Sequence, residues 1–210
     1  MIKEACIENI KEALIAQESG ADRVELCNNL AIGGVTPSYG TIKFCRQNLE
    51  ISLMTMIRPR GGDFVYNDLE FEIMKEDIRV CKQLGSDGVV FGILTADNKI
   101  DAVRTRQLVE LSRPMKVTFD KVFDEVEKPF EEMEKLIECG VDRVLSSGTK
   151  ATAKEGKDIL NELIRKANGS IKIIVAGRVV KETLFELSQQ ILSDEFHGRR
   201  IVFNPDEPEK

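Results

Sequence analysis

The chain has 210 residues, 42% of them hydrophobic and 31% charged, which is enough to bury the core of one globular domain. Its formal net charge of −6 argues against a nucleic-acid or anionic-membrane surface, because either partner requires a basic stripe. No apolar run reaches the roughly 18 residues of a membrane span.

Apolar and β-branched runs predict eight strands, and the stretches between them have helical periodicity. In chain order the predicted strands are 2–6, 23–27, 51–58, 88–94, 115–120, 143–147, 171–176 and, with the weakest pattern, 195–203. The predicted helices are 8–19, 37–48, 68–84, 101–112, 129–139, 153–167 and 181–192. Strict alternation implies a parallel sheet, and a count of eight favours a TIM-type (β/α)8 barrel over a doubly wound open sheet. We therefore expect residues 1–210 to form a single α/β barrel domain.

A short motif occurs three times, as GADRVELC from Gly20, GSDGVVFG from Gly85 and GVDRVLSSG from Gly140. Each copy follows a helical pattern, and its glycine suits a helix C-terminus that needs a positive φ. The aspartate two positions later favours a tight turn. Because the copies lie about two βα units apart, we expect them to open the second, fourth and sixth strands.

The eighth predicted strand is followed only by NPDEPEK, so the barrel is expected to lack its final helix. The seam between the last and first strands should then expose Ile2, Ile201 and Phe203. An exposed apolar patch predicts a homo-oligomer, most simply a homodimer, with the seam covered by the partner or by closing loops.

Polar side chains end several predicted strands, where the functional groups of a barrel gather. Alternation along a strand places Glu4 with Cys6, and Glu25 with Cys27, on the face opposite the apolar residues. Asp120 ends the fifth strand in the same way. Since charges are rarely buried unless paired or used, the three carboxylates are candidate general acids or bases.

The segment RPRGGDFVYN follows the third predicted strand and brings Arg58, Arg60 and Asp63 within six positions. Two guanidinium groups suit a carboxylate or phosphate, so these are the candidate ligand-binding residues for a small anion. An internal brace that ties the loop down explains the same residues, and both interpretations stay open. LSSGT after the sixth strand can also offer backbone amides and hydroxyls to an anion.

The five cysteines include no Cys-x-x-Cys pair, and no spacing of cysteine and histidine is typical of a zinc site, so the sequence does not predict bound zinc. With no signal-peptide segment at the N-terminus, we expect reduced thiols in the cytoplasm. The single histidine, His197, falls in the last predicted strand and is interpreted as structural or exposed.

The stretch EACIENIKEALIAQESGADRVELCNNLAIGGVTPSYGTIK, with MIRPRGGDFVYN after it, resembles the CutC family of copper homeostasis proteins. RPMKVTFDKVFDEV, GVDRVLSSG and the later EFHG continue the resemblance over nearly the whole chain. The resemblance implies a TIM barrel, a cytoplasmic location and Cu(I) binding, with Cys6 and Cys27 as the candidate metal ligands. Soft thiolates suit Cu(I), so this transfer is chemically sensible.

Two segments depart from the family pattern. Family members commonly read TFHRAFD where this chain has TFDKVFD, so Asp120 replaces the usual histidine. The family's MPGGGI appears here as IVAGRV, residues 174–179, which removes a proline and two glycines. Ala176 and Arg178 stand where glycines would let backbone amides approach an anion, although Arg178 can itself hold one.

Two functions are open at this point. One is a cytosolic protein that binds or carries Cu(I) through the two strand-end cysteines. The other is a barrel enzyme acting on a small anionic metabolite, with the arginines of the RPR segment binding the anion and a strand-end carboxylate as general acid or base. A barrel fold alone supports neither over the other.

Overall fold

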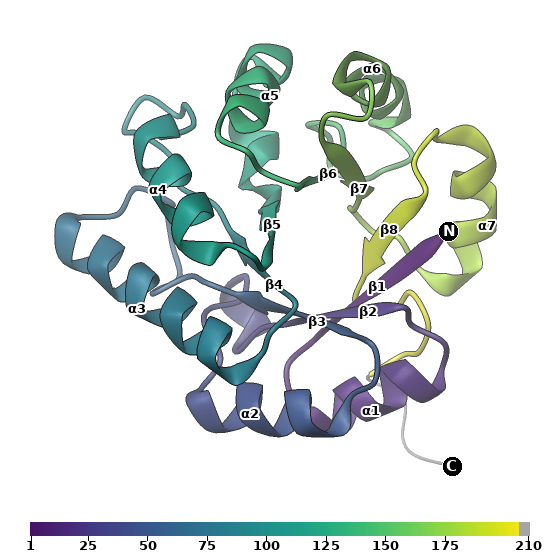
Figure 1. Cartoon of the computed structure of the whole chain (residues 1–210). Coiled ribbons are helices and arrows are strands. Elements are labelled where there is room, and N and C mark those ends of the chain that lie inside the picture. The colour runs from purple at the N-terminus through teal and green to yellow at the C-terminus, as the bar shows by residue number, and fades with distance from the viewer. Residues whose placement is uncertain (206–210) are drawn as a thin grey trace.

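The computed structural model describes residues 1–205, which form a closed barrel of eight parallel strands (Figure 1). The strands follow one another around the barrel in chain order, and β8 closes it against β1. Their bounds are β1 Ile2–Ile7, β2 Arg23–Leu26, β3 Ser52–Met56, β4 Gly88–Phe91, β5 Lys116–Phe119, β6 Arg143–Ser146, β7 Lys172–Val175 and β8 Glu195–Gly198. The prediction of a parallel (β/α)8-type barrel is confirmed.

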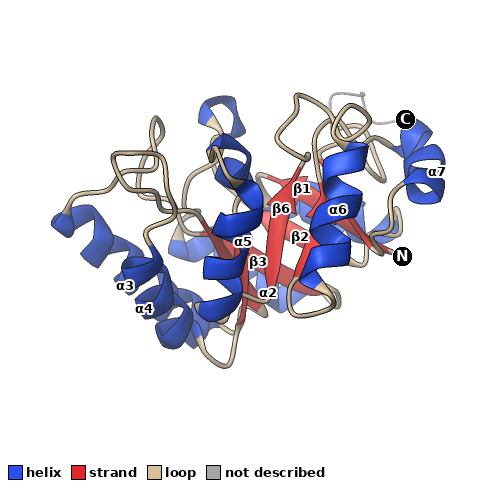
Figure 2. Cartoon of the chain, turned by 90° about the horizontal axis from the view of Figure 1, so that it is seen from above, coloured by secondary structure: helices blue, strands red, loops and turns tan. Residues whose placement is uncertain are grey.

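Seven α-helices lie outside the barrel, one after each of the first seven strands (Figures 1 and 2). They are α1 Ile10–Glu18, α2 Tyr39–Asn48, α3 Asp68–Leu84, α4 Ala102–Ser112, α5 Pro129–Glu138, α6 Lys157–Ala167 and α7 Lys181–Gln190. Two 3-10 helices, η1 Leu30–Ile32 and η2 Lys121–Glu125, sit in the loops after β2 and β5. Among residues 1–205, no helix has both the length and the apolar character needed to cross a membrane.

The three motif copies open β2, β4 and β6, as predicted. Their glycines end the preceding helices with positive φ values of +86°, +82° and +79° at Gly20, Gly85 and Gly140. In each copy the aspartate carboxylate accepts a hydrogen bond from a backbone N–H of the preceding strand, and the aspartate N–H donates to the carbonyl of that same residue. The carboxylate contacts join Asp22 to Lys3, Asp87 to Leu53 and Asp142 to Val117, at 2.8, 2.8 and 2.9 Å. The motif therefore fixes the starts of β1, β3 and β5 to the turns that open β2, β4 and β6.

The strands divide their side chains between two environments, as period-two alternation requires. Val24 and Leu26 of β2 point outward into the main core under the helices. A separate small cluster fills the upper barrel interior, formed by Cys6, Cys27, Met54, Met56 and Val90, with Leu30 packed against it. The predicted inward direction of the two strand-end cysteines is thus what the fold shows.

The segment after β8 corrects the predicted seam. The strand ends at Gly198 and does not run to 203, and no helix follows it within residues 199–205. Arg199 donates to Glu12 of α1 at 2.5 Å, so the segment is tied against that helix. Ile201 is only 1% exposed, while Ile2 and Phe203 are half-buried. The expected exposed apolar seam is wrong because this chain's own residues cover it; the homodimer stays a prediction.

Candidate functional site

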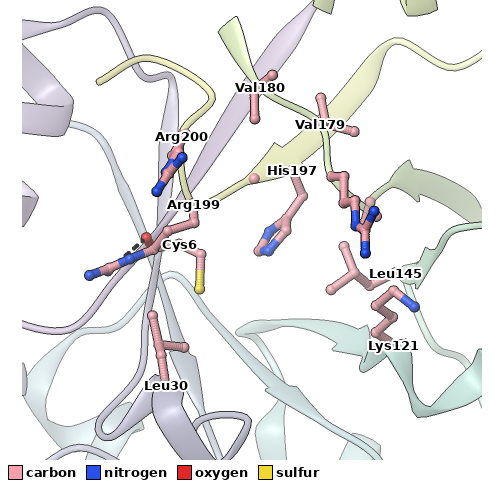
Figure 3. Close-up of a pocket in the computed structure, with 13 residues that line it drawn as sticks. Cys6, Leu30, Lys121, Leu145, Val179, Val180, His197, Arg199 and Arg200 are labelled. Atoms are coloured by element: carbon pink, nitrogen blue, oxygen red, sulfur yellow. Dashed lines mark hydrogen bonds between the residues drawn. The ribbon is translucent and has the colours of Figure 1, made fainter. Parts of the chain in front are cut away.

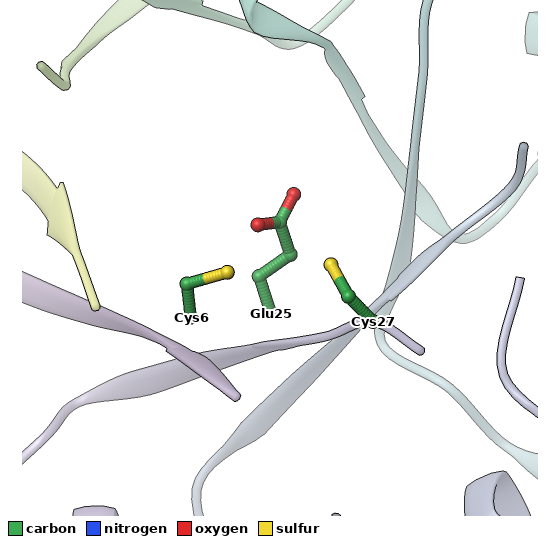
Figure 4. A group of neighbouring side chains, drawn as sticks. All are labelled: Cys6, Glu25 and Cys27. Carbon is green, nitrogen blue, oxygen red and sulfur yellow. The ribbon is translucent and has the colours of Figure 1, made fainter. Parts of the chain in front are cut away.

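The carboxyl ends of β1 and β2 bring Cys6, Glu25 and Cys27 together inside the barrel (Figure 4). Cys6 and Glu25 are register partners on the two strands, and Cys27 lies one pleat further along. The two sulfur atoms and a carboxylate oxygen all lie within 4.8 Å of one another. The side chains are 7%, 3% and 1% exposed, so the group is dry but Cys6 reaches the surface of the cavity above it.

His197 completes this group from β8. The register of the closed barrel places Glu4 between Arg23 on β2 and His197 on β8. His197 Nδ1 lies 2.8 Å from Glu4 Oε1, and its Nε2 lies 3.7 Å from Glu25 Oε2. The interpretation of His197 as merely structural or exposed missed this position. Only the pairing of β8 with β1 reveals it, and one short strand pattern gives no sign of its partner.

A buried ionic layer lies beneath the site. Arg23 donates to Glu4 and, at 2.6 Å, to Glu195, and Arg143 donates to Glu195 at 3.2 Å. Glu4 therefore binds Arg23 through one oxygen and His197 through the other. Glu4 contacts the imidazole and does not line the cavity, and its role as a general acid or base stays a prediction.

Proton affinities in the group are strongly perturbed. The hydrogen bond from Cys27 lowers the pKa of the Cys6 thiol to about 5 against the effect of burial, with help from His197. Burial lowers the pKa of His197, but the Glu25 carboxyl and the contact with Cys6 raise it well above its usual value. The same hydrogen bond raises the pKa of Cys27, and burial raises that of Glu25. The lowered pKa thus favours the thiolate form of Cys6, and thiolate is the form that binds metals.

Asp120 lies deep in the barrel mouth, 7% exposed, with its carboxylate accepting a hydrogen bond from the backbone of Lys121. Burial raises its pKa, although the charge of Arg58 opposes the rise. A buried carboxyl with a raised pKa has the property that a general acid needs. Its neighbourhood also includes the hydroxyl of Thr118, which has no hydrogen-bond partner among the described residues.

The arginines of the RPR segment are engaged within the chain. The Arg58 guanidinium donates to the carbonyls of Ile32, Gly34 and Gly62 at 3.2, 3.0 and 2.6 Å, and it lies 4.2 Å from the Phe64 ring centroid. These contacts match the internal-brace interpretation, in which Arg58 joins the loops after β2 and β3.

Arg60 is engaged in the same way. It pairs with Asp63 at 2.9 Å and with Glu70 of α3 at 2.6 Å. The structure thus brings Arg60 and Asp63 together as predicted, but as partners of each other on the exposed side of the loop.

The LSSGT loop binds an anionic group of this chain itself, the Asp124 carboxylate. The Asp124 carboxylate accepts from Ser146 Oγ, from both the N–H and Oγ of Ser147, and from Thr149 N–H, at 2.6 to 2.9 Å. Lys121 Nζ adds an ion pair at 2.8 Å. These bonds hold the pKa of Asp124 below its usual value, although burial acts the other way. The loop therefore has no room for an exogenous anion on the same donors.

A cavity of about 630 Å³ opens at the barrel mouth above Cys6 and His197 (Figure 3). Its basic side chains come from Lys121, Arg178, Arg199 and Arg200, and no acidic side chain of the described residues lines it. Leu30, Leu145, Val179 and Val180 supply apolar wall. Lys121 and Arg199 are already paired with Asp124 and Glu12, yet four cations at one rim of a chain with a net charge of −6 still favour an anionic occupant.

Arg178 reaches this cavity through an unusual backbone. Its φ is +57°, in the left-handed region that glycine adopts without cost, and Gly177 before it has φ +94°. The segment thus places a guanidinium at the rim on a backbone of glycine-like conformation, at a position where the family pattern has glycine. Holding a non-glycine residue there costs about 1 kcal/mol, which a role for the side chain can offset.

The comparisons with known proteins agree on one family. A family model described as the CutC family matches residues 1–202. A CutC family protein of Chromobacterium violaceum is 45% identical over 197 residues, which cover 94% of this chain and 80% of the relative. A human protein named copper homeostasis protein cutC homolog is 41% identical over 196 residues, covering 93% of this chain and 72% of the relative.

Solved structures give the same result. A CutC protein of Streptococcus agalactiae superposes with a TM-score of 0.91 at 38% identity, covering 96% of this chain and 99% of that one. The deoxyribose phosphate aldolase of Aeropyrum pernix superposes with a TM-score of 0.69 at 12% identity, covering 94% and 85%. The second likeness shows a shared fold alone.

Proposed function

This chain belongs to the CutC family, and we propose that it acts in copper homeostasis by binding Cu(I) through Cys6 and Cys27 in the cytoplasm. One observation carries the proposal: two buried thiols on adjacent strands have their sulfur atoms within 4.8 Å of each other. All five cysteines are free, which suits a reducing compartment.

The spacing of the two thiols suits the ion. A near-linear S–Cu–S unit with bonds of about 2.3 Å, the length of a Zn–S bond, spans about 4.6 Å. Cu(I) is soft and prefers thiolates, and Cys6 already carries the lowered pKa of one. Binding then needs only the proton of Cys27 to leave. Met54 and Met56 surround the pair with apolar, polarisable side chains that exclude water.

Transport of the ion requires a route to the surface, and the cavity supplies one. Cys6 lines its floor, whereas Cys27 lies behind and is 1% exposed. An incoming Cu(I) complex would meet Cys6 first and transfer to the pair by ligand exchange. We also propose a homodimer, which light scattering at micromolar concentration tests directly.

The test is Cu(I) titration in competition with bicinchoninate under anaerobic conditions. The wild type should bind one equivalent tightly, and the Cys6→Ser/Cys27→Ser double variant should lose that binding. A Cys45→Ser/Cys81→Ser variant is the matched control, because those thiols are buried in α2 and α3 outside the barrel. Equal Cu(I) affinity in the wild type and the Cys6/Cys27 variant contradicts the proposal.

A second function, an enzyme acting on a small anionic metabolite, is favoured by the cavity alone. Its cationic rim and apolar wall suit a carboxylate or phosphate joined to a short apolar body. Asp120 and Glu25 do not line the cavity, but both are buried carboxyls inside the barrel with raised pKa values, so they are the proposed acid or base. In this proposal Arg178 binds the anion, in place of Arg58 and Arg60.

A thermal-shift screen with inorganic phosphate, phosphoglycolate and malonate tests it, because a ligand that binds only the folded state raises the melting temperature. Arg178→Ala should remove the shift given by any of these anions. Arg165→Ala on the exposed face of α6 is the matched control. Shifts that survive Arg178→Ala and vanish in Arg58→Ala would return the grip to the RPR segment.

A further inference from the structure

The thiol site contains more donors than Cu(I) requires. Two thiolates complete a near-linear Cu(I) site, yet Glu25 is packed against them and 3% exposed. Its Oε1 is buried and has no hydrogen-bond partner among the described residues. Leaving a buried carboxylate oxygen unpaired costs about 1–3 kcal/mol or more, so the oxygen calls for a partner that residues 1–205 do not provide.

The imidazole of His197 is oriented as a ligand. Its Nδ1 contacts Glu4 Oε1 at 2.8 Å, and the Arg23 guanidinium fixes Glu4 from the other side. With Nδ1–H donating to that carboxylate, Nε2 is directed toward Glu25, 3.7 Å away, and toward the Cys6 thiol. A carboxylate behind the far nitrogen of a histidine is the arrangement that fixes metal-bound imidazoles.

We propose that Cys6, Cys27, Glu25 and His197 form a four-ligand site for Zn(II). Two thiolates, an imidazole nitrogen and a carboxylate oxygen are a donor set that zinc takes in tetrahedral geometry. Two sulfurs on one tetrahedral zinc lie about 3.8 Å apart for bonds of about 2.3 Å. The donor atoms of Cys6, Cys27 and Glu25 already lie within 4.8 Å of one another, and His197 Nε2 lies 3.7 Å from Glu25 Oε2, so His197 has to move toward the two sulfurs to complete the site.

The site was invisible to a search for zinc spacing because its ligands come from three strands. Cys6 lies on β1, Glu25 and Cys27 belong to β2 and its end, and His197 lies on β8. Barrel closure brings the first and last strands together, which no linear spacing reports. The proposal does not depend on Cu(I) binding, but both ions use the same thiols and so exclude each other.

The two metals can be separated by the donors that only one of them needs. Glu25→Gln and His197→Gln each remove one zinc ligand and leave both thiols in place. Each should weaken Zn(II) binding at least about tenfold while changing Cu(I) affinity less than about threefold. Thr118→Val is the matched control, since it alters a buried, unpartnered polar group of the barrel interior outside the cluster.

The experiment uses the full chain freed of metal by a chelator, with Zn(II) titrated against a chromophoric competitor and Co(II) as a spectroscopic probe. The expected result is one equivalent of Zn(II) and a Co(II) complex with thiolate charge-transfer and tetrahedral visible bands. Retained Cu(I) binding in each variant confirms that the thiol site is intact. Full Zn(II) affinity in Glu25→Gln and His197→Gln overturns the proposal, as does a Co(II) spectrum without thiolate bands. Zn(II) binding without Cu(I) binding overturns the copper proposal and keeps this one.

Discussion

Removing one buried arginine should destabilise the barrel more than any surface charge does. Arg23 is 4% exposed and lies between two carboxylates, Glu4 and Glu195, that are 1% and 5% exposed. Arg23→Met keeps the length and apolar stem of the side chain but leaves both carboxylates without their shared cation. Buried charges lose water that only a partner replaces, so the change acts on electrostatics and not on packing volume.

The size of the effect follows from the contacts that remain. Breaking a buried ion pair by removing one partner costs about 3–5 kcal/mol. Glu4 retains His197, and Glu195 retains Arg143 at 3.2 Å, so neither carboxylate is wholly unpaired. We therefore expect a loss of about 4 kcal/mol, a large share of the 5–15 kcal/mol that holds a typical domain together.

Urea unfolding followed by fluorescence and circular dichroism gives the free energy of unfolding. Arg46→Met is the matched control, because its ion pair with Asp87 is 22% and 47% exposed and should contribute about 1 kcal/mol or less. Adding Glu195→Gln to Arg23→Met should recover about 1–3 kcal/mol, because it removes a buried carboxylate that has lost its shorter ion pair and keeps only the 3.2 Å contact with Arg143. A loss below 1 kcal/mol in Arg23→Met, or no recovery in the double variant, refutes the reasoning.

Four further outcomes are expected. The pKa of Glu4 is lowered from 4.5 to about 2, which contributes about 3 kcal/mol of stability. This contribution is complete above pH 4.5 and is lost as the pH falls toward 2. In urea unfolding, Glu4→Gln should flatten that part of the curve of stability against pH. Asp124→Asn turns an amide NH2 toward N–H donors and should cost about 3 kcal/mol by the same assay; an unchanged midpoint contradicts this. Gly88→Ala would place a Cβ 2.3 Å from Met54 Cε, so overpacking should reduce the free energy of unfolding by about 2–3 kcal/mol and lower the melting temperature. An unchanged melting temperature would mean that the Met54 side chain moves aside without cost. Arg178→Gly should raise the unfolding free energy by up to about 1 kcal/mol through relief of its positive φ, and calorimetry showing a loss would mean that the side chain itself stabilises the rim.

Local sequence patterns were sufficient to predict most of the fold. Period-two alternation placed Glu25 and Cys27 opposite Val24 and Leu26, and the structure confirms that division. Helix-end glycines located the three repeated turns, because a positive φ at a helix terminus leaves a direct mark on the sequence. The prediction for the chain after Gly198 was wrong, because the burial of this segment depends on contacts with α1 that no local pattern encodes.

The site was predicted in part for the same reason. Cys6, Glu25 and Cys27 follow from alternation on two neighbouring strands, which is a local property. His197 and Arg23 do not, because each gains its role only through a register partner on another strand. Arg58 illustrates the converse. The two arginines of the RPR segment suggested an anion-binding site, but the hydrogen bonds of Arg58 go to loop carbonyls.

The repeated motif links the fold to the thiol site. The residue after the motif's aspartate is Arg23 in the first copy, Gly88 in the second and Arg143 in the third. The two arginines converge on Glu195, while the glycine leaves the space that Met54 fills. Two copies thus supply the cations that keep a buried charge layer neutral, and that layer keeps Glu4 ionised. Because ionised Glu4 fixes the imidazole above it, a turn motif at the base of the barrel sets the geometry of the proposed metal-binding group at its mouth.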